Sequence, residues 1–282
     1  MPSAMTRPTP TPAADADRLS GHRTLRGLAN KEVKAAVAET GSGPAVVFLH
    51  GLVGLNDHWD EVVQRTRAAA RCVMLELPLL DLEGDDCSIH GATELTVRFL
   101  DQHLRQPAVL VGNSFGGHVA TKIALERPDL CRGLVLAGAS GLIEKSMVSD
   151  IQIRPSREWL QRKIGELFFD QSKMNPADVE RAFQQLSLRG RARAMVKLSR
   201  SARRNHLGDQ ISAITTPTLL IWGRQDIVTP PEAADEFKAK IRDSRLVWFD
   251  QCGHAPMIEC PQAFAHALTG FVGELEARSL AN

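Results

Sequence analysis

Short runs of nearly continuous apolar residues recur along the chain from about residue 45 onward. Runs of this kind are expected of strands that are buried on both faces of a parallel sheet; they cover residues 45–49, 72–77, 108–112, 134–138, 218–222 and 245–249. Helical spacing of apolar residues fills the segments between them, at 58–69, 92–104, 116–127, 231–241 and 261–277. This alternation predicts right-handed crossovers and an open sheet with helices on both faces.

Two regions depart from the alternation. Residues 32–40 alternate apolar and polar side chains, which predicts an antiparallel edge strand. Residues 141–216 separate two strand candidates, and a structureless loop of that length is rare in a compact domain. Helical faces are visible there instead, one at Trp159, Leu160, Ile164, Leu167 and Phe168 and another at Val179, Ala182, Phe183 and Leu186. Asn175-Pro176 is typical of a helix start.

These patterns predict an α/β fold with a mostly parallel sheet, flanked by helices and carrying an inserted helical cap. The core is expected to comprise residues 26–140 and 217–282, and the cap residues 141–216. The cap should cover the carboxyl edge of the sheet, where open α/β sheets bind ligands. Residues 1–25 are rich in Pro, Thr and Ala and lack the apolar stretch of a signal peptide, which predicts a disordered tail.

Composition narrows the partners that we expect. The net charge of +1 gives no reason to expect binding to nucleic acid or to an anionic membrane. No run of 18 apolar residues predicts a membrane span. Five cysteines without a closely spaced pair favour reduced thiols in the cytoplasm over a disulfide framework or a zinc site. A small-molecule substrate is therefore the expected partner, and the sequence indicates no oligomeric state.

The candidate nucleophile is Ser114, in the segment AVLVGNSFGG at residues 108–117. A buried strand leads into a G-x-S-x-G turn and a helical pattern follows at once. In such a turn the serine has a strained backbone, and glycines are needed two residues to either side, here Gly112 and Gly116. The alternative is a glycine-rich turn with an incidental serine. The strand before and the helix after it favour the nucleophile.

A serine hydroxyl needs a base to remove its proton. Among nine histidines, His254 lies between the last strand candidate and the last helix, whereas His50 ends an earlier strand whose loop has another expected role. Asp226 follows the strand at 218–222 and precedes His254, giving the chain order Ser, Asp, His. It is expected to fix the tautomer of His254, although an isolated aspartate at this place would also suit a loop or a helix cap.

The fourth candidate element follows the strand in VVFLHGLVG, residues 46–54. The backbone N–H groups of Leu52 and Phe115 are expected to form an oxyanion hole above Ser114. One donor of this kind contributes about 3 kcal/mol to transition-state stabilisation.

With these motifs in order, residues 30–278 resemble the α/β-hydrolase superfamily. GNSFGG, WGRQDIVTP and CGHAPMIECP are most similar to the carbon–carbon bond hydrolases of meta-cleavage products and to related esterases. The resemblance implies a capped serine hydrolase with no cofactor or metal, and it marks Asn113 as a candidate substrate contact. The loop LVGLND and Ala255 depart from those hydrolases, so the substrate stays open. Relatives with an aspartate nucleophile or cap tyrosines are excluded, because this chain has Ser114 and no tyrosine.

A basic segment at residues 189–204 carries seven arginine and lysine side chains and no acid. It is either a solvated helix face or a source of one inward arginine, Arg189, Arg191 or Arg193, that binds a substrate carboxylate. Nucleic-acid binding has no supporting motif.

The expected reaction is hydrolysis, through an acyl-enzyme, of a small ester or of a carbon–carbon bond in a vinylogous diketone acid. A cofactor-free perhydrolase or acyltransferase uses the same triad and is the enzymatic alternative. A ligand-binding receptor that retains the triad is the non-enzymatic one.

Overall fold

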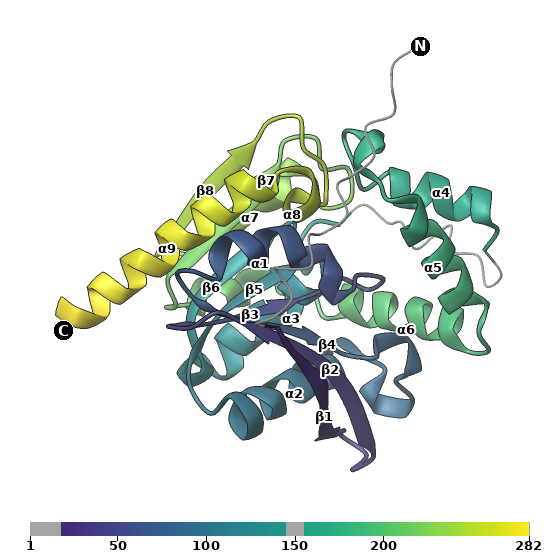
Figure 1. The fold of residues 1–282 in the computed structure, drawn as a ribbon, viewed down its shortest axis with the longest axis horizontal. Helices are drawn as coiled ribbons and strands as arrows, with labels where there is room; N and C mark the ends of the chain where they lie inside the picture. Colours follow the sequence, from purple (N-terminus) through teal and green to yellow (C-terminus); the bar gives the residue numbers. More distant parts are fainter. Residues whose placement is uncertain (1–17, 145–154, 282) are drawn as a thin grey trace.

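The computed structural model describes residues 18–144 and 155–281, in which eight strands form one sheet in the order β1-β2-β4-β3-β5-β6-β7-β8 (Figure 1). The strands are β1 (Leu19–Arg26), β2 (Glu32–Thr40), β3 (Ala45–Leu49), β4 (Arg71–Glu76), β5 (Ala108–Asn113), β6 (Cys131–Ala137), β7 (Thr218–Gly223) and β8 (Ser244–Phe249). β1 and β2 are antiparallel to their neighbours, and the pairs from β4 to β8 are parallel. The predicted mostly parallel α/β sheet is confirmed.

The six predicted parallel strands all form, with ends that move by at most three residues. Every residue of β3, β5 and β7 is buried, which explains why these strands are continuous apolar runs.

The edge of the sheet differs from the prediction. Residues 19–25 were assigned to a disordered tail and residues 32–40 to the edge strand, but β1 pairs with β2 along its whole length and is itself the edge. Within β1 only Leu25 is buried, so the strand has no alternating pattern that marks it in the sequence. A tight turn, closed by the Gly27 N–H on the Lys31 carbonyl at 2.8 Å, brings it beside β2. Residues 1–17 of the predicted tail lie outside the described residues.

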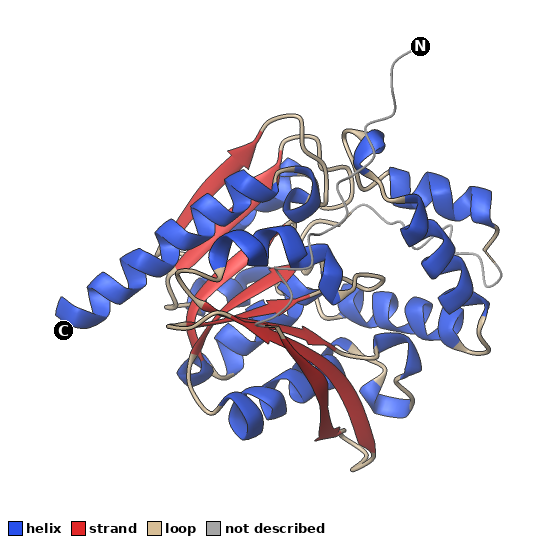
Figure 2. Ribbon diagram, viewed as in Figure 1, coloured by secondary structure: helices blue, strands red, loops and turns tan. Residues whose placement is uncertain are grey.

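Helices cover both faces of the sheet (Figure 2). One apolar cluster joins the sheet to helices α1 (Asp60–Thr66) and α9 (Pro261–Ala281). A second cluster on the opposite face includes α2 (Ile89–Phe99), α3 (Phe115–Glu126) and α7 (Pro231–Lys240). The core is therefore a three-layer sandwich, and the carboxyl ends of its strands are left for the site.

The described part of the predicted cap range contains three α-helices, α4 (Arg157–Gly165), α5 (Pro176–Ser187) and α6 (Arg191–Arg204), on the side of the molecule away from the end of α9 (Figure 1). The Asn175 side chain accepts a hydrogen bond from the Ala177 N–H at 3.0 Å, as a helix start requires. A small apolar cluster of its own joins the three helices: Trp159, Leu160, Val179, Ala182, Leu186, Ala192 and Met195. Residues 145–154 of this range lie outside the described residues. None of the helices described is both long and apolar enough to cross a membrane.

Candidate active site

The turn between β5 and α3 places Ser114 in an unusual backbone conformation, with φ +53° and ψ −118°. A Cβ at Gly112 would lie 2.4 Å from the Gly116 carbonyl oxygen, and one at Gly116 would lie 2.3 Å from that of Leu49. Neither position accepts a larger residue without movement of the backbone. The G-x-S-x-G pattern is therefore a steric requirement of this turn, and Ser114 lines the pocket above the sheet.

Asp226 and His254 meet through a hydrogen bond of 2.9 Å between Oδ2 and Nδ1. The other aspartate oxygen accepts the N–H groups of Val228 and Thr229 at 2.8 and 3.0 Å, and the Thr229 hydroxyl donates to Oδ2 at 2.9 Å. Because Asp226 is buried and its oxygens are saturated with donors, it is held as an oriented carboxylate. With the Nδ1 proton directed at this carboxylate, Nε2 is the nitrogen left to act as a base.

Opposing influences set the protonation of His254. Burial, the largest, would lower its pKa, but the charge of Asp226, their hydrogen bond and the charge of Glu144 together raise it above the usual value. Glu144 lines the pocket just before the undescribed segment, and burial raises the pKa of its carboxyl. Two acids therefore raise the pKa of the base: Asp226, which is the predicted partner, and Glu144, which the sequence offers only as the second choice.

Gly138, directly after β6, is a site residue that sequence reasoning missed. Its φ is +51°, and a Cβ there would lie 3.0 Å from Asp226 Oδ2 and 3.1 Å from His254 Nδ1. Gly138 is the last residue of the apolar run 134–138, and the absence of a side chain there leaves room for the acid–base pair.

The loop after β3 lies beside the nucleophile. A Cβ at Gly51 would be 3.5 Å from the Ser114 Cβ, and Leu52 lines the same pocket as Ser114. Phe115 is the first residue of α3, where a backbone N–H has no partner within the helix. His50 Nδ1 bonds the Gly51 carbonyl at 2.7 Å, and burial lowers the pKa of His50. The placement is compatible with the predicted oxyanion hole, which remains a prediction.

Asn113 lines the cavity, but its side-chain NH₂ group is engaged within the protein, so its contact with a substrate remains a prediction. Its side-chain amide donates to the backbone carbonyls of Ala137 at 2.9 Å and His254 at 3.1 Å, and the residue is buried. Asn113 thus links the nucleophile turn to the histidine loop. A substrate would have to replace these internal bonds to use the amide.

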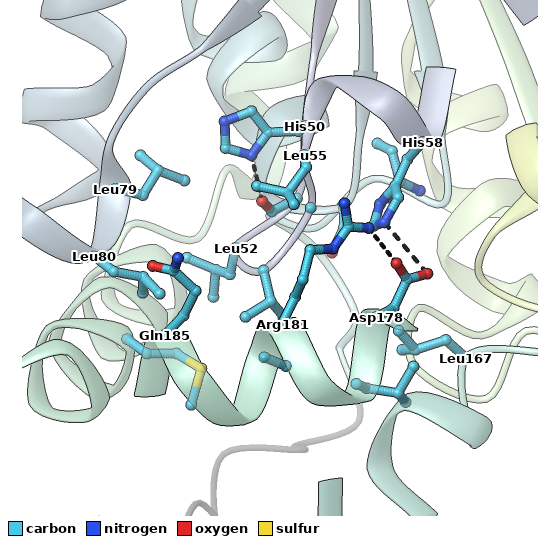
Figure 3. A pocket seen from close by; sticks show the side chains of 18 of the residues that line it. His50, Leu52, Leu55, His58, Leu79, Leu80, Leu167, Asp178, Arg181 and Gln185 are labelled. Carbon is cyan, nitrogen blue, oxygen red and sulfur yellow. Dashed lines mark hydrogen bonds and ion pairs between the residues drawn. The ribbon is translucent and has the colours of Figure 1, made fainter. Parts of the chain in front are cut away.

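Above Ser114 and His254 lies a cavity of about 460 Å³ between the strand ends and the cap. Figure 3 shows Leu52, Leu55, Leu79, Leu80 and Leu167 around it, so most of the wall in view is aliphatic. A polar cluster of His58, Asp178 and Arg181 lies on one side in the same view. A volume of this size suits a small organic substrate.

The cations on the described wall of this cavity all pair with carboxylates. Arg191 binds Asp81 through two hydrogen bonds of 2.6 and 2.7 Å. Arg181 bonds both Asp57 and Asp178. Lys163 lies 3.0 Å from Glu166. The guanidinium and ammonium groups on the described walls are therefore already paired with carboxylates of the protein.

For the basic segment, these contacts favour the solvated helix face over an inward arginine that binds a substrate carboxylate. Arg189 and Arg193 are exposed, and of the three named arginines only Arg191 is found on the described lining of the cavity. Arg181, outside the basic segment, reaches the cavity and was missed. Of its two acidic partners, Asp178 lies three residues earlier on the same helix, α5, whereas Asp57 comes from the core, 124 residues away in the sequence.

The described residues contain no cluster of three histidine, cysteine, aspartate or glutamate side chains suited to a metal ion. All five cysteines are free thiols.

Comparison with known proteins places residues 46–267 in a match to the model of the Alpha/beta hydrolase family. A pimeloyl-[acyl-carrier protein] methyl ester esterase of Nitrosomonas europaea is 28% identical over 242 residues, covering 81% of this chain and 95% of that protein. A 2-hydroxymuconate semialdehyde hydrolase of Pseudomonas putida is 29% identical over 193 residues, covering 65% of this chain and 69% of that protein.

Solved structures show the same fold. A mutant of the meta-cleavage product hydrolase CumD from Pseudomonas fluorescens aligns with a TM-score of 0.77 at 20% identity, covering 89% of this chain and 97% of the other. A thermophilic esterase from Thermogutta terrifontis aligns with a TM-score of 0.75 at 21% identity, covering 90% and 99%.

Proposed function

The chain belongs to the α/β-hydrolase family and is a hydrolase, and we propose that it cleaves small, uncharged carboxylic esters through an acyl-enzyme on Ser114. The observation that carries this proposal is the hydrogen-bonded Asp226–His254 pair on the floor of the aliphatic cavity that Ser114 also lines.

In the proposed reaction, Nε2 of His254 removes the hydroxyl proton of Ser114 as the oxygen attacks the ester carbonyl. The N–H groups of Leu52 and Phe115 stabilise the negative oxygen that forms. His254 then returns the proton to the departing alcohol. A water molecule, activated by the same histidine, hydrolyses the acyl-enzyme and restores the serine.

The charge of the cavity supports an uncharged substrate. Among the described lining residues, the formal charges are negative at Glu76, Asp81, Glu144 and Asp178 and positive at Lys163, Arg181 and Arg191. Since the three cations are engaged and the acids outnumber them, a second carboxylate on the substrate would gain little attraction. The ester therefore ranks above the vinylogous diketone acid, although relatives of both kinds are known.

A matched pair of substrates tests this choice. We expect p-nitrophenyl methyl adipate, which is uncharged, to be hydrolysed with a kcat/KM at least about tenfold above that of p-nitrophenyl hydrogen adipate, which carries a free carboxylate. This ratio corresponds to a difference of about 1.4 kcal/mol. The same panel includes a meta-cleavage dienoate. A preference for the free acid, or faster turnover of the dienoate, would contradict the proposal.

The nucleophile is tested separately by covalent labelling. A fluorophosphonate probe should label Ser114, and Ser114→Ala should lose both the label and the turnover while its circular dichroism spectrum stays that of the wild type. Removal of a serine nucleophile lowers kcat by about 10⁶ in a well-studied protease. A label on another serine would remove the basis of the mechanism.

A further inference from the structure

A buried carboxylate next to the site has no part in the proposed reaction. Glu259 is 3% exposed, ends the short helix α8 (Pro256–Glu259) and comes five residues after His254. Its Oε1 accepts the Gly253 N–H at 2.6 Å, and its Oε2 accepts the N–H groups of Phe169 and Asp170 at 2.9 and 3.1 Å. Three backbone donors thus converge on one side chain.

These donors come from two parts of the molecule. Gly253 immediately precedes His254, whereas Phe169 and Asp170 belong to the cap segment that follows α4. Directly beside them, the His254 N–H donates to the Leu167 carbonyl at 2.7 Å. The loop that carries the base and the segment that forms a cavity wall are therefore joined both by Glu259 and by the backbone.

The junction is sterically tight. A Cβ at Gly253 would lie 2.7 Å from the Leu167 carbonyl oxygen, 2.9 Å from the Phe169 nitrogen and 3.1 Å from Glu259 Oε1. A glycine is thus required for the cap to come so close to the base loop. Small displacements of the cap segment must be transmitted to residue 253 and its neighbour.

A carboxylate suits this place better than any other side chain. It is acceptor-only, so both oxygens can receive N–H groups, and bonds to an ionised acceptor are stronger than neutral ones. Burial raises the pKa of Glu259, while the bonds from Gly253, Asp170 and Phe169 and the charge of Lys173 act in the opposite direction. Lys173 also donates to the Glu259 backbone carbonyl at 2.6 Å, which adds a cationic side chain of the cap to the junction.

We propose that Glu259 is a positioning residue that holds the catalytic base in a fixed relation to the Leu167–Asp170 segment, whose Leu167 and Phe168 line the cavity, so that one carboxylate sets both turnover and acyl-chain selection. The inference rests on the proposed role of His254. Glu259 acts through other groups, because it is not among the described residues that line the cavity, whereas its neighbours Leu167, Phe168, Met257 and Ile258 are.

The test compares Glu259→Gln and Glu259→Asp with the wild type on p-nitrophenyl acetate and p-nitrophenyl hexanoate. In Glu259→Gln an amide NH₂ faces at least one backbone N–H, so kcat on acetate should fall about 10- to 100-fold through the base loop. On hexanoate, which reaches the wall, KM should also rise at least about threefold. Glu259→Asp keeps the charge but is one methylene shorter, and it should recover part of kcat.

Two controls separate positioning from general stability. Glu274→Gln removes an exposed carboxylate that pairs with Arg245 on the surface, and it should leave both substrates unchanged. Gly253→Ala perturbs the junction from the other side and should reproduce the loss of kcat on acetate and the rise in KM on hexanoate. It also keeps the test decisive if Glu259→Gln does not fold.

The outcomes are distinct. Variants of Glu259 and Gly253 that lose thermal stability but keep kcat and KM within twofold on both esters would overturn the proposal and leave a purely structural carboxylate. A wild-type protein without fluorophosphonate labelling of Ser114 would instead refute the proposed function, whatever the Glu259 variants do.

Discussion

The floor of the cavity is formed by the loops that follow β3, β4, β5, β7 and β8, whereas its roof is formed by the cap helices α4, α5 and α6. On the floor, close backbone approaches at Gly112 and Gly116 and buried hydrogen bonds to Asp226 hold the catalytic groups in place. The roof has its own small apolar cluster and meets the core in part through the ion pairs of Arg181 and Arg191 with Asp57 and Asp81.

The floor and the roof of the cavity should respond differently to amino-acid substitution. A partly exposed ion pair contributes about 0–1 kcal/mol, and its long side chains can adjust. A strained turn or a buried acid–base pair has no such freedom. Substitutions in the floor should therefore act mainly on kcat, and substitutions in the roof mainly on KM and on the choice of substrate.

The largest effect is expected on the floor at Asp226. Asp226→Asn replaces the anionic partner of His254 by an amide and favours the wrong tautomer, which lowers kcat by about 10⁴ in a serine protease. Steady-state kinetics on p-nitrophenyl acetate measures the loss. Asp250→Asn, at an exposed aspartate that pairs with Arg224, is the control and should be neutral. Activity within a fewfold of wild type would mean that another acid, first of all Glu144, orients the base.

A smaller floor effect is expected at Gly138. Alanine there has an unfavourable positive φ and a Cβ about 3 Å from both members of the acid–base pair, so kcat should fall about 10- to 100-fold and stability by about 1 kcal/mol. Gly273→Ala in α9 is the matched control, because its Cβ meets nothing within 4 Å; it should stabilise the protein by about 0.5–1 kcal/mol. Equal kinetics for the two variants would show that the floor is more adaptable than its geometry indicates.

Glu144 tests the electrostatics where floor and roof meet. Its charge contributes to the raised pKa of His254, and the reaction needs neutral His254, so activity is lost as the pH falls through that pKa. Glu144→Gln should therefore lower this pKa and extend the acidic limb of the kcat/KM profile to lower pH. A limb that stays in place, or that moves to higher pH, would contradict the assignment.

The smallest effect is expected in the roof at Arg191. Since its guanidinium is engaged by Asp81, Arg191→Ala should change kcat/KM by no more than about threefold, and equally for the uncharged and acidic adipate esters. Arg193→Ala, at an exposed neighbour on the same helix, provides the baseline. A loss about 30-fold larger for the acidic ester would show that Arg191 binds a substrate carboxylate, and the floor–roof distinction would then need revision.

The same contrast explains what the sequence could predict. Ser114 and Asp226 follow the fully buried strands β5 and β7, and His254 follows β8, an apolar run that is only partly buried at the sheet edge. The strand pattern alone brings all three to one edge of the sheet. Arg181 acquires its role from Asp57, 124 residues away, and Glu259 from the amides of Phe169 and Asp170, about 90 residues away. No local pattern records such contacts, because they depend on how the cap is docked.

Prediction failed at β1 for a related reason. A strand at the sheet edge buries few side chains, and here the neighbouring strand supplies the order that the hydrophobic pattern lacks. Asn113 stands next to Ser114 in the sequence, but the two carbonyls that bind its amide lie 24 and 141 residues away, so no local pattern shows these bonds.

The cap leaves the core after β6 and returns before β7, and its two ends are fastened together. The Leu207 N–H donates to the Gly141 carbonyl at 2.8 Å, and Gly141, with φ +111°, leaves room for the Leu207 side chain. The two ends of the cap insertion are thus held together by a backbone hydrogen bond. We therefore expect that an insertion of another length can replace this one while the strands that lead to Ser114 and His254 keep their places. Any replacement must also supply backbone N–H groups to Glu259 in place of those of Phe169 and Asp170.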